Sequence, residues 1–289
     1  MVRRLKEAGA IVVASVVSGP AGSVIAGDSA ATNASGAAAF SGLKLTGLVG
    51  NYGLRFAASG FSSIVGATAL TPGAAAKLGI TTAPNSDPQS GIAFTTQPVV
   101  QVQDASGNAV AQAGLVVRAS VPGATLTNDS ATTDAAGKAA FSGLILSGPA
   151  AIHVLSFTTT GLTAATSAPI GLSAGTASQL ALATQPAFTA QSGVVLTRQP
   201  VVRLQDASGN VVGQANVVVT VTVVSGTVTL ATATAATTAG GTATFATLSR
   251  TGRVGSYPRR CSAPSVSRVD AASPTVLSAG PAKQLSLTT

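Results

Sequence analysis

The sequence has no tryptophan, one cysteine and one histidine among its 289 residues, and only 8% of its residues are charged. The single cysteine, Cys261, excludes an internal disulfide. The single histidine, His153, restricts any histidine-centred catalytic set to one position, and eight acids leave few carboxylates for acid–base or metal chemistry. No apolar run approaches the roughly 18 residues of a membrane span. We therefore expect that the chain is not an enzyme, that it binds no cofactor or metal, and that it does not insert into a membrane.

The low charge is accompanied by a basic excess, with a formal net charge of +8. Such an excess can indicate nucleic-acid binding when the bases form a stripe or a patch. Here half of the sixteen bases are scattered singly, and the other half form two clusters, one at the N-terminus and one in the last fifty residues. The second cluster consists of Arg250, Arg253, Arg259, Arg260 and Arg268. The distribution predicts no nucleic-acid partner.

What the sequence does contain is a long internal repeat. The segment PVVQVQDASGN at 98–108 returns as PVVRLQDASGN at 200–210, which is 102 positions later. A fixed period of this length is typical of tandem small domains. Together with the recurring Gly-x-x-x-Phe and Ser-Ala-Gly motifs it predicts four segments. They are a truncated repeat at 1–73, a repeat at 74–175, a repeat at 176–280 with a divergent second half, and the first strand of a further repeat at 281–289.

Within each repeat the hydrophobic residues alternate with a period of two. Tyr52, Leu54 and Phe56 alternate with small or polar residues, and His153, Leu155 and Phe157 do the same one repeat later. Short alternating runs separated by glycine, proline, asparagine and serine clusters are typical of strands in a sandwich. The sequence predicts an all-β chain of tandem antiparallel β-sandwiches.

The order of these motifs resembles a known family. Asp-Ala-Ser-Gly-Asn, a valine-rich strand, TTDAAGKAAF, Leu-x-Leu-x-Gly and a closing Tyr/His-x-Leu-x-Phe resemble the bacterial immunoglobulin-like repeats of invasin- and intimin-type surface proteins. The resemblance implies immunoglobulin-like sandwiches strung into a stalk, spacer or adhesive fibre on a bacterial cell surface or in a secreted protein. It implies contacts with neighbouring repeats of the same polypeptide, and a host or neighbouring-cell surface protein or glycan as partner.

The N-terminus imitates a secretory leader, since the basic MVRRLKE precedes a short apolar run. The repeat alignment favours another interpretation. Residues 11–16 align with 115–120 and 217–222, so we expect a strand in the truncated repeat, with Met1 an internal start or a fragment boundary.

The two Asp-Ala-Ser-Gly-Asn loops offer oxygen atoms from Asp104 with Asn108 and from Asp206 with Asn210. Calcium requires six to eight oxygens, usually from several carboxylates, and each loop has one carboxylate. We therefore predict turns, in which each aspartate accepts backbone N–H bonds and Gly107 or Gly209 takes a positive φ.

The repeat alignment also assigns two residues that would otherwise suggest catalysis. His153 falls at the position of Tyr52 and Tyr257, which predicts a half-buried ring with a polar tip, comparable to the tyrosine corner of these sandwiches. Cys261 falls at the position of Phe56 and Phe157, which predicts a small core residue.

The arginines at 250–268 leave two hypotheses open. Arg250 and Arg259 replace leucines of the sister repeats, and Pro258 enters a strand that elsewhere has no proline. The favoured hypothesis is a degenerated or locally disrupted repeat with inward-facing guanidinium groups. The alternative is a glycan- or anionic-surface-binding site, with Arg250, Arg253, Arg259, Arg260 and Arg268 as candidate ligand-binding residues.

Overall fold

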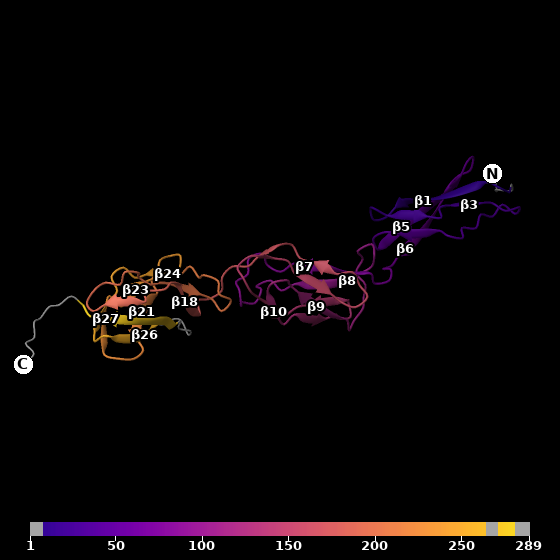
Figure 1. Cartoon of the computed structure of the whole chain (residues 1–289). Helices are drawn as coiled ribbons and strands as arrows, with labels where there is room; N and C mark the ends of the chain where they lie inside the picture. The colour runs from indigo at the N-terminus through magenta and orange to yellow at the C-terminus, as the bar shows by residue number, and fades with distance from the viewer. Residues whose placement is uncertain (1–7, 264–270, 281–289) are drawn as a thin grey trace, which may run out of the picture.

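The computed structural model describes residues 8–263 and 271–280. The strand predicted at 281–289, the basic stretch 1–7 and Arg268 lie outside the described residues. All regular secondary structure in the described part is β-strand, which confirms the all-β prediction. It contains no helix that could cross a membrane. Figure 1 shows three bodies following one another end to end. We call them the N-terminal sheet (8–70), the middle sandwich (76–172) and the C-terminal sandwich (177–278).

The middle sandwich is built from short strands in two main sheets. Its strands are β7 (Lys77–Thr82), β8 (Val99–Gln103), β9 (Val116–Ser120), β10 (Thr125–Thr127), β11 (Ser130–Thr132), β12 (Lys138–Ala140), β13 (Ile145–Ser147), β14 (Ile152–His153), β15 (Ser156–Thr158), β16 (Ala165–Thr166) and β17 (Ile170–Gly171). One sheet has the order β12-β8-β7 and the other has the order β11-β9-β15-β16. The pairs β10–β13 and β14–β17 form two further, two-stranded sheets.

The chain crosses between these two sheets in a Greek-key path. β8 pairs with β12 in one sheet, while β9, which lies between them in sequence, pairs with β15 in the other. All of these pairings are antiparallel. This is the strand arrangement of immunoglobulin-like sandwiches. The fold is immunoglobulin-like.

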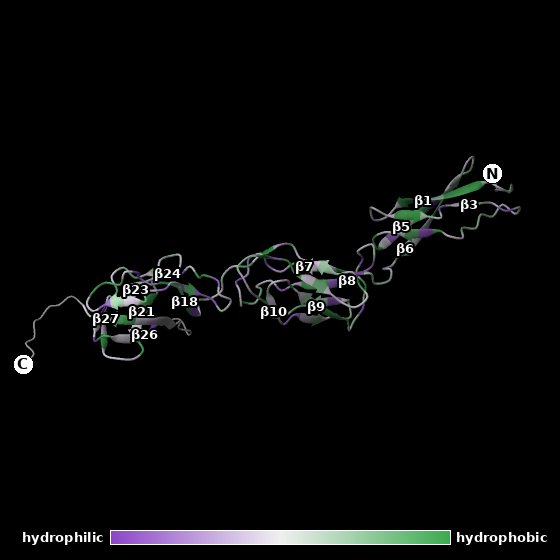
Figure 2. Ribbon diagram, viewed as in Figure 1, coloured by the Kyte–Doolittle hydropathy of each residue, from purple (hydrophilic) through white to green (hydrophobic). Residues whose placement is uncertain are grey.

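The alternation seen in the sequence is the alternation of burial. In β9, Val117 and Ala119 are buried, whereas the residues between and beside them are exposed. From the opposite sheet Val100 and Val102 complete the contact. Side chains of successive strand residues point to opposite faces, so such a strand covers the core with one face only. In Figure 2 the hydrophobic colour is prominent along strands such as β1.

The C-terminal sandwich repeats this plan. Its strands are β18 (Gln179–Thr184), β19 (Thr189–Gln191), β20 (Val201–Gln205), β21 (Val218–Val223), β22 (Val228–Ala231), β23 (Thr234–Ala236), β24 (Thr242–Thr244), β25 (Ser249–Gly252), β26 (Gly255–Ser262) and β27 (Ala271–Ser278). The sheets have the orders β18-β20-β24 and β19-β27-β26-β21-β23, with β22–β25 as a separate pair. Pro258 lies where the pairing of β26 with β27 shifts register, as expected for a residue that lacks an N–H.

The N-terminal sheet corresponds to one half of this plan. Its strands are β1 (Ile11–Ser18), β2 (Val24–Ala26), β3 (Ser29–Ala31), β4 (Lys44–Thr46), β5 (Gly50–Ala58) and β6 (Ile64–Leu70). They form a sheet of order β3-β1-β5-β6 and the pair β2–β4. β1 covers the segment for which the sequence predicted a strand. Phe40 and Phe56 meet edge to face at 5.5 Å, as Phe141 and Phe157 do at 5.3 Å in the middle sandwich.

Candidate functional site at the junctions between sandwiches

The two Asp-Ala-Ser-Gly-Asn segments, which we call the junction loops (104–108 and 206–210), are tight turns. In the first, the Asp104 N–H donates to the Asn108 carbonyl at 2.9 Å and the Gly107 N–H donates to the Asp104 carbonyl at 3.1 Å. The φ angles of Gly107 and Gly209 are +91° and +87°. The predicted turn geometry is confirmed, including the positive φ that glycine adopts without steric cost.

Each aspartate does more than close its turn. One carboxylate oxygen of Asp206 accepts N–H bonds from Ser208 and Asn210, both at 2.9 Å. The other accepts from the Gly175 N–H in the linker and from the Asn210 side chain, both at 2.8 Å. Asp104 makes the equivalent linker bond to the Gly73 N–H, at 2.9 Å. The carboxylate therefore fixes the linker and the asparagine amide in one arrangement.

The asparagine at the end of each junction loop reaches the preceding body of the chain. The Asn108 amide donates to the Gly47 carbonyl at 2.9 Å and its oxygen accepts from the Val49 N–H at 2.8 Å. The Asn210 amide makes the same pair with the Gly148 carbonyl at 2.9 Å and the Ala150 N–H at 2.7 Å. The side-chain amide thus pairs as a peptide group would in a sheet.

The segments that accept these asparagines, which we call the receiving loops, are 47–49 and 148–150, with a third counterpart at 252–254. A ring four residues beyond the central residue holds each one. The Tyr52 hydroxyl donates to the Leu48 carbonyl at 2.6 Å and the Tyr257 hydroxyl to the Arg253 carbonyl at 3.0 Å.

In the middle sandwich this ring is His153. Its Nε2 lies 2.9 Å from the Pro149 carbonyl, which can only accept, so Nε2 carries the proton and donates. The predicted equivalence with tyrosine is confirmed. At 1% and 8% exposed, however, Tyr52 and His153 are more buried than the half-buried ring that the sequence predicted.

The aspartate electrostatics follow from these contacts. Burial alone raises the pKa of Asp104 and Asp206. The hydrogen bonds from the asparagine side chain, the linker glycine N–H and the turn N–H groups outweigh burial, so both pKa values lie below the ordinary range. Both carboxylates are therefore ionised at neutral pH and strengthen the bonds they accept.

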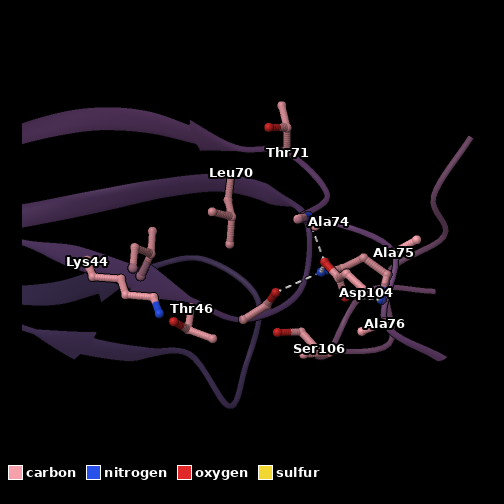
Figure 3. A pocket seen from close by; sticks show the side chains of 14 residues that line it. Lys44, Thr46, Leu70, Thr71, Ala74, Ala75, Ala76, Asp104 and Ser106 are labelled. Carbon is pink, nitrogen blue, oxygen red and sulfur yellow. Dashed lines mark hydrogen bonds between the residues drawn. The ribbon is translucent and has the colours of Figure 1, made fainter. Parts of the chain in front are cut away.

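A shallow cleft lies beside the first junction, with a volume of about 420 Å³ (Figure 3). Lys44, Thr46 and Leu70 line it from the N-terminal sheet, and Asp104 and Ser106 line it from the middle sandwich. Asp104 is the only carboxylate among the lining residues, and hydrogen bonds to the linker and the turn already occupy it. The cleft therefore lies between two bodies that are already joined by hydrogen bonds. Its lining residues contain no pair of groups for acid–base catalysis.

Of the five arginines predicted as candidate ligand-binding residues, Arg268 lies outside the described residues, and the other four are not all on the surface. Arg250 and Arg259 are 0% and 1% exposed, because they occupy the inward positions of Leu146 and Leu155. Arg253 and Arg260 are exposed. Arg250 and Arg259 are thus unavailable to a surface ligand, which corrects that part of the alternative hypothesis. The inward orientation is what the favoured hypothesis of a disrupted repeat requires.

The two buried guanidinium groups have few partners. Arg250 Nη1 donates to the Thr275 carbonyl at 3.4 Å and its guanidinium lies 5.1 Å from the centre of the Tyr257 ring, while Arg259 Nη2 contacts the Thr275 hydroxyl. Two nitrogens of each side chain have no hydrogen-bond partner among the described residues. Burial and the adjacent positive charge of Arg250 lower the pKa of Arg259 to about 10. Cys261 is buried beside them, as predicted.

Comparison with known proteins gives matches among solved structures alone. No family model and no curated protein matches the sequence. The D0-D1 domain of intimin is 19% identical over 68% of this chain and 98% of that one, with a TM-score of 0.26. The D00-D0 domain of intimin is 17% identical over 70% and 98%, with a TM-score of 0.35. The Yersinia pseudotuberculosis adhesin InvE is 21% identical over 69% and 58%, with a TM-score of 0.30.

These matches are to proteins of the kind that the repeat motifs resemble. At such low identities and TM-scores the assignment of the fold rests on the sheet order described above. The sequence analysis predicted the turn in the junction loops but did not predict the contact that each loop makes with the preceding body. One feature of the sequence could have indicated this contact. Both copies have an asparagine at the fifth position of the loop, although the turn itself requires only the aspartate and the glycine.

Proposed function

We propose that the chain is a stalk or spacer of a bacterial cell-surface or secreted adhesin, in which immunoglobulin-like repeats stack as a semi-rigid rod. We take the repeats as 1–73, 74–175, 176–280 and 281–289. The observation that carries this proposal is the recurrence of one junction. Asn108 and Asn210 bind the preceding body through the same pair of backbone groups, and Asp104 and Asp206 bind the linker in the same way.

The energetics of a junction suit this role. Each hydrogen bond contributes about 0.5–1.5 kcal/mol net, so the two asparagine bonds favour the docked arrangement by about 1–3 kcal/mol. Since 1.4 kcal/mol is a factor of ten, such a junction is docked most of the time and can still open under load. The linkers at 71–75 and 173–176 are too short for the sandwiches to separate widely.

The contacts where the chain enters and leaves a sandwich also support a mechanical role. In the middle sandwich the Gly171 N–H donates to the Ser86 carbonyl at 2.7 Å and the Ser173 N–H to the Pro88 carbonyl at 3.0 Å. In the C-terminal sandwich β19 runs parallel to β27. Tension along the rod would load these parallel bonds together in shear, so they would share the force instead of breaking one at a time.

Replacing Asn210 by alanine is expected to loosen the second junction without unfolding either sandwich. The change removes both bonds to the receiving loop and leaves the Asp206–Gly175 bond in place. With spin labels on exposed Ser120 and Thr229, we expect the narrow distance distribution of the wild type to broaden. Gln205→Ala is the matched control, because Gln205 bonds the same loop at Gly209 but does not reach the middle sandwich. Equal widths for Asn210→Ala and the wild type would contradict the proposal.

A further inference from the structure

The far end of the C-terminal sandwich carries a third receiving loop, Gly252-Arg253-Val254, at the position of the two that are occupied. We propose that this end is a docking surface for the Asp-Ala-Ser-Gly-Asn loop of a further immunoglobulin-like sandwich joined through the linker at Gly280. The proposal extends the stacking of the preceding section to another junction and rests on it.

The third receiving loop already has the geometry of the occupied ones. The Tyr257 hydroxyl holds the Arg253 carbonyl as Tyr52 and His153 hold theirs. A serine also braces the first glycine from the side. Ser192 Oγ donates to the Gly252 carbonyl and accepts from its N–H, both at 3.1 Å.

Ser90 makes the same two bonds to Gly148 at the occupied second junction, at 3.3 and 3.2 Å. There the serine also lies 3.0 Å from Ser208 of the junction loop. Ser192 is therefore placed to meet the serine of an incoming loop.

The linker glycine is in place as well. At the second junction Gly175 lies so close to the Ser90 carbonyl that a Cβ would collide with it, and its N–H donates to Asp206. Gly280 lies in the same way against the Ser192 carbonyl. The Gly280 N–H is therefore the counterpart of the donor that binds the aspartate of a junction loop.

No junction loop of this chain is left for this surface. The sequence contains two Asp-Ala-Ser-Gly-Asn loops, and both are bound at the other junctions. Val254, the counterpart of Val49 and Ala150, is 67% exposed. The occupant must supply an amide that donates to the Gly252 carbonyl and accepts from the Val254 N–H, and a carboxylate for the Gly280 N–H. An Asp-x-Ser-Gly-Asn turn supplies all three.

The strength of the expected bonds indicates whether the docking sandwich is a separate molecule or is joined to this chain. Two amide bonds contribute about 1–3 kcal/mol, which is too little to hold two separate molecules, since even a millimolar complex requires about 4 kcal/mol. A sandwich tethered through a short linker docks in an intramolecular step, which does not include the entropy cost of bringing two separate molecules together. The same two bonds then favour docking as they do at the occupied junctions. The occupant is therefore a tethered sandwich and not a diffusing one.

The test uses residues 1–280 of the chain followed directly by a second copy of residues 176–289, which takes the place of residues 281–289. Spin labels on unnatural residues at Thr229 of both copies report the distance between the two sandwiches and leave Cys261 untouched. We expect one narrow distance peak, and loss of that peak when Asn210→Ala is introduced in the appended copy alone. Gln205→Ala in the appended copy should preserve it.

A broad distribution in the unmutated chain, or a peak unaffected by Asn210→Ala, would overturn the inference. The second junction serves as the internal reference, with labels at Ser120 and Thr229 of the original copy. If Asn210→Ala in the original copy broadens that distance while the appended copy shows no effect, the docking surface is wrong and the stalk proposal stands. If neither responds, the stalk proposal fails as well.

Discussion

Replacing Arg259 by leucine is expected to stabilise the C-terminal sandwich, by about 1–4 kcal/mol. Arg259 is 1% exposed, Nε and Nη1 have no hydrogen-bond partner among the described residues, and the charge of Arg250 is close enough to lower its pKa. A leucine at this position packs at 0% exposed in the middle sandwich, as Leu155. The substitution removes the desolvation of a cation, and Thr275 keeps its bond to the Ala187 carbonyl at 3.2 Å.

Calorimetry of the full chain measures this effect. A gain of 1 kcal/mol raises the melting temperature of a domain of this size by roughly 4–8 °C, so one thermal transition should move upward and the others should stay. Adding Cys261→Phe restores the sister pattern opposite Phe245 and should not reverse the gain. Arg260→Leu is the control, because Arg260 is the exposed neighbour and should leave the transitions unchanged. If Arg259→Leu produces no rise, the view of the third repeat as disrupted by inward charges is wrong.

Replacing Asp206 by alanine is expected to destabilise the C-terminal sandwich and its junction by about 2–4 kcal/mol. The change leaves the N–H donors of Gly175, Ser208 and Asn210 without their acceptor, at a site where the aspartate is 2% exposed. Bonds to a charged group contribute about 1.5–3 kcal/mol each, and partial access of water to the linker reduces their sum. Urea unfolding of the full chain measures the loss. Asp134→Ala is the matched control, since Asp134 accepts two turn N–H bonds at 2.9 Å in an exposed loop.

The pH dependence of the free energy of unfolding tests whether the negative charge of Asp206 contributes to stability, in addition to the packing of its side chain. Because the folded-state pKa of Asp206 is depressed, the stability it contributes is present above the unfolded pKa of about 3.8 and is lost as pH falls through the lower folded value. Wild-type stability should therefore fall more steeply below pH 4 than that of Asp206→Ala. Parallel acid profiles for the two proteins, or equal losses for Asp134→Ala and Asp206→Ala at neutral pH, would contradict the assigned role.

Local patterns predicted most of the fold. The alternation in β9, the turn of the junction loop and the equivalence of His153 with tyrosine all depend on residues close in sequence or on comparison of the copies. The inward orientation of Arg250 and Arg259 followed from their alignment with leucines.

The junction could not be predicted in this way. Asn210 meets Gly148 and Ala150, which are 62 and 60 residues away. Such a contact depends on how two finished sandwiches abut, and a pattern within one repeat does not encode it. The third receiving loop was hidden for the same reason, because its glycine and ring are also ordinary features of a single sandwich.

Small-angle X-ray scattering of the full chain tests the stacked arrangement most directly. A compact protein of this length has a radius of gyration of about 19 Å and an unfolded one of about 60 Å. Sandwiches fixed end to end by Asn108 and Asn210 predict a value between the two, with a cross-section no thicker than a single sandwich. They also predict that Asn108→Ala combined with Asn210→Ala broadens the distribution of lengths. A radius near 19 Å, or a profile that the double variant does not alter, would contradict the account.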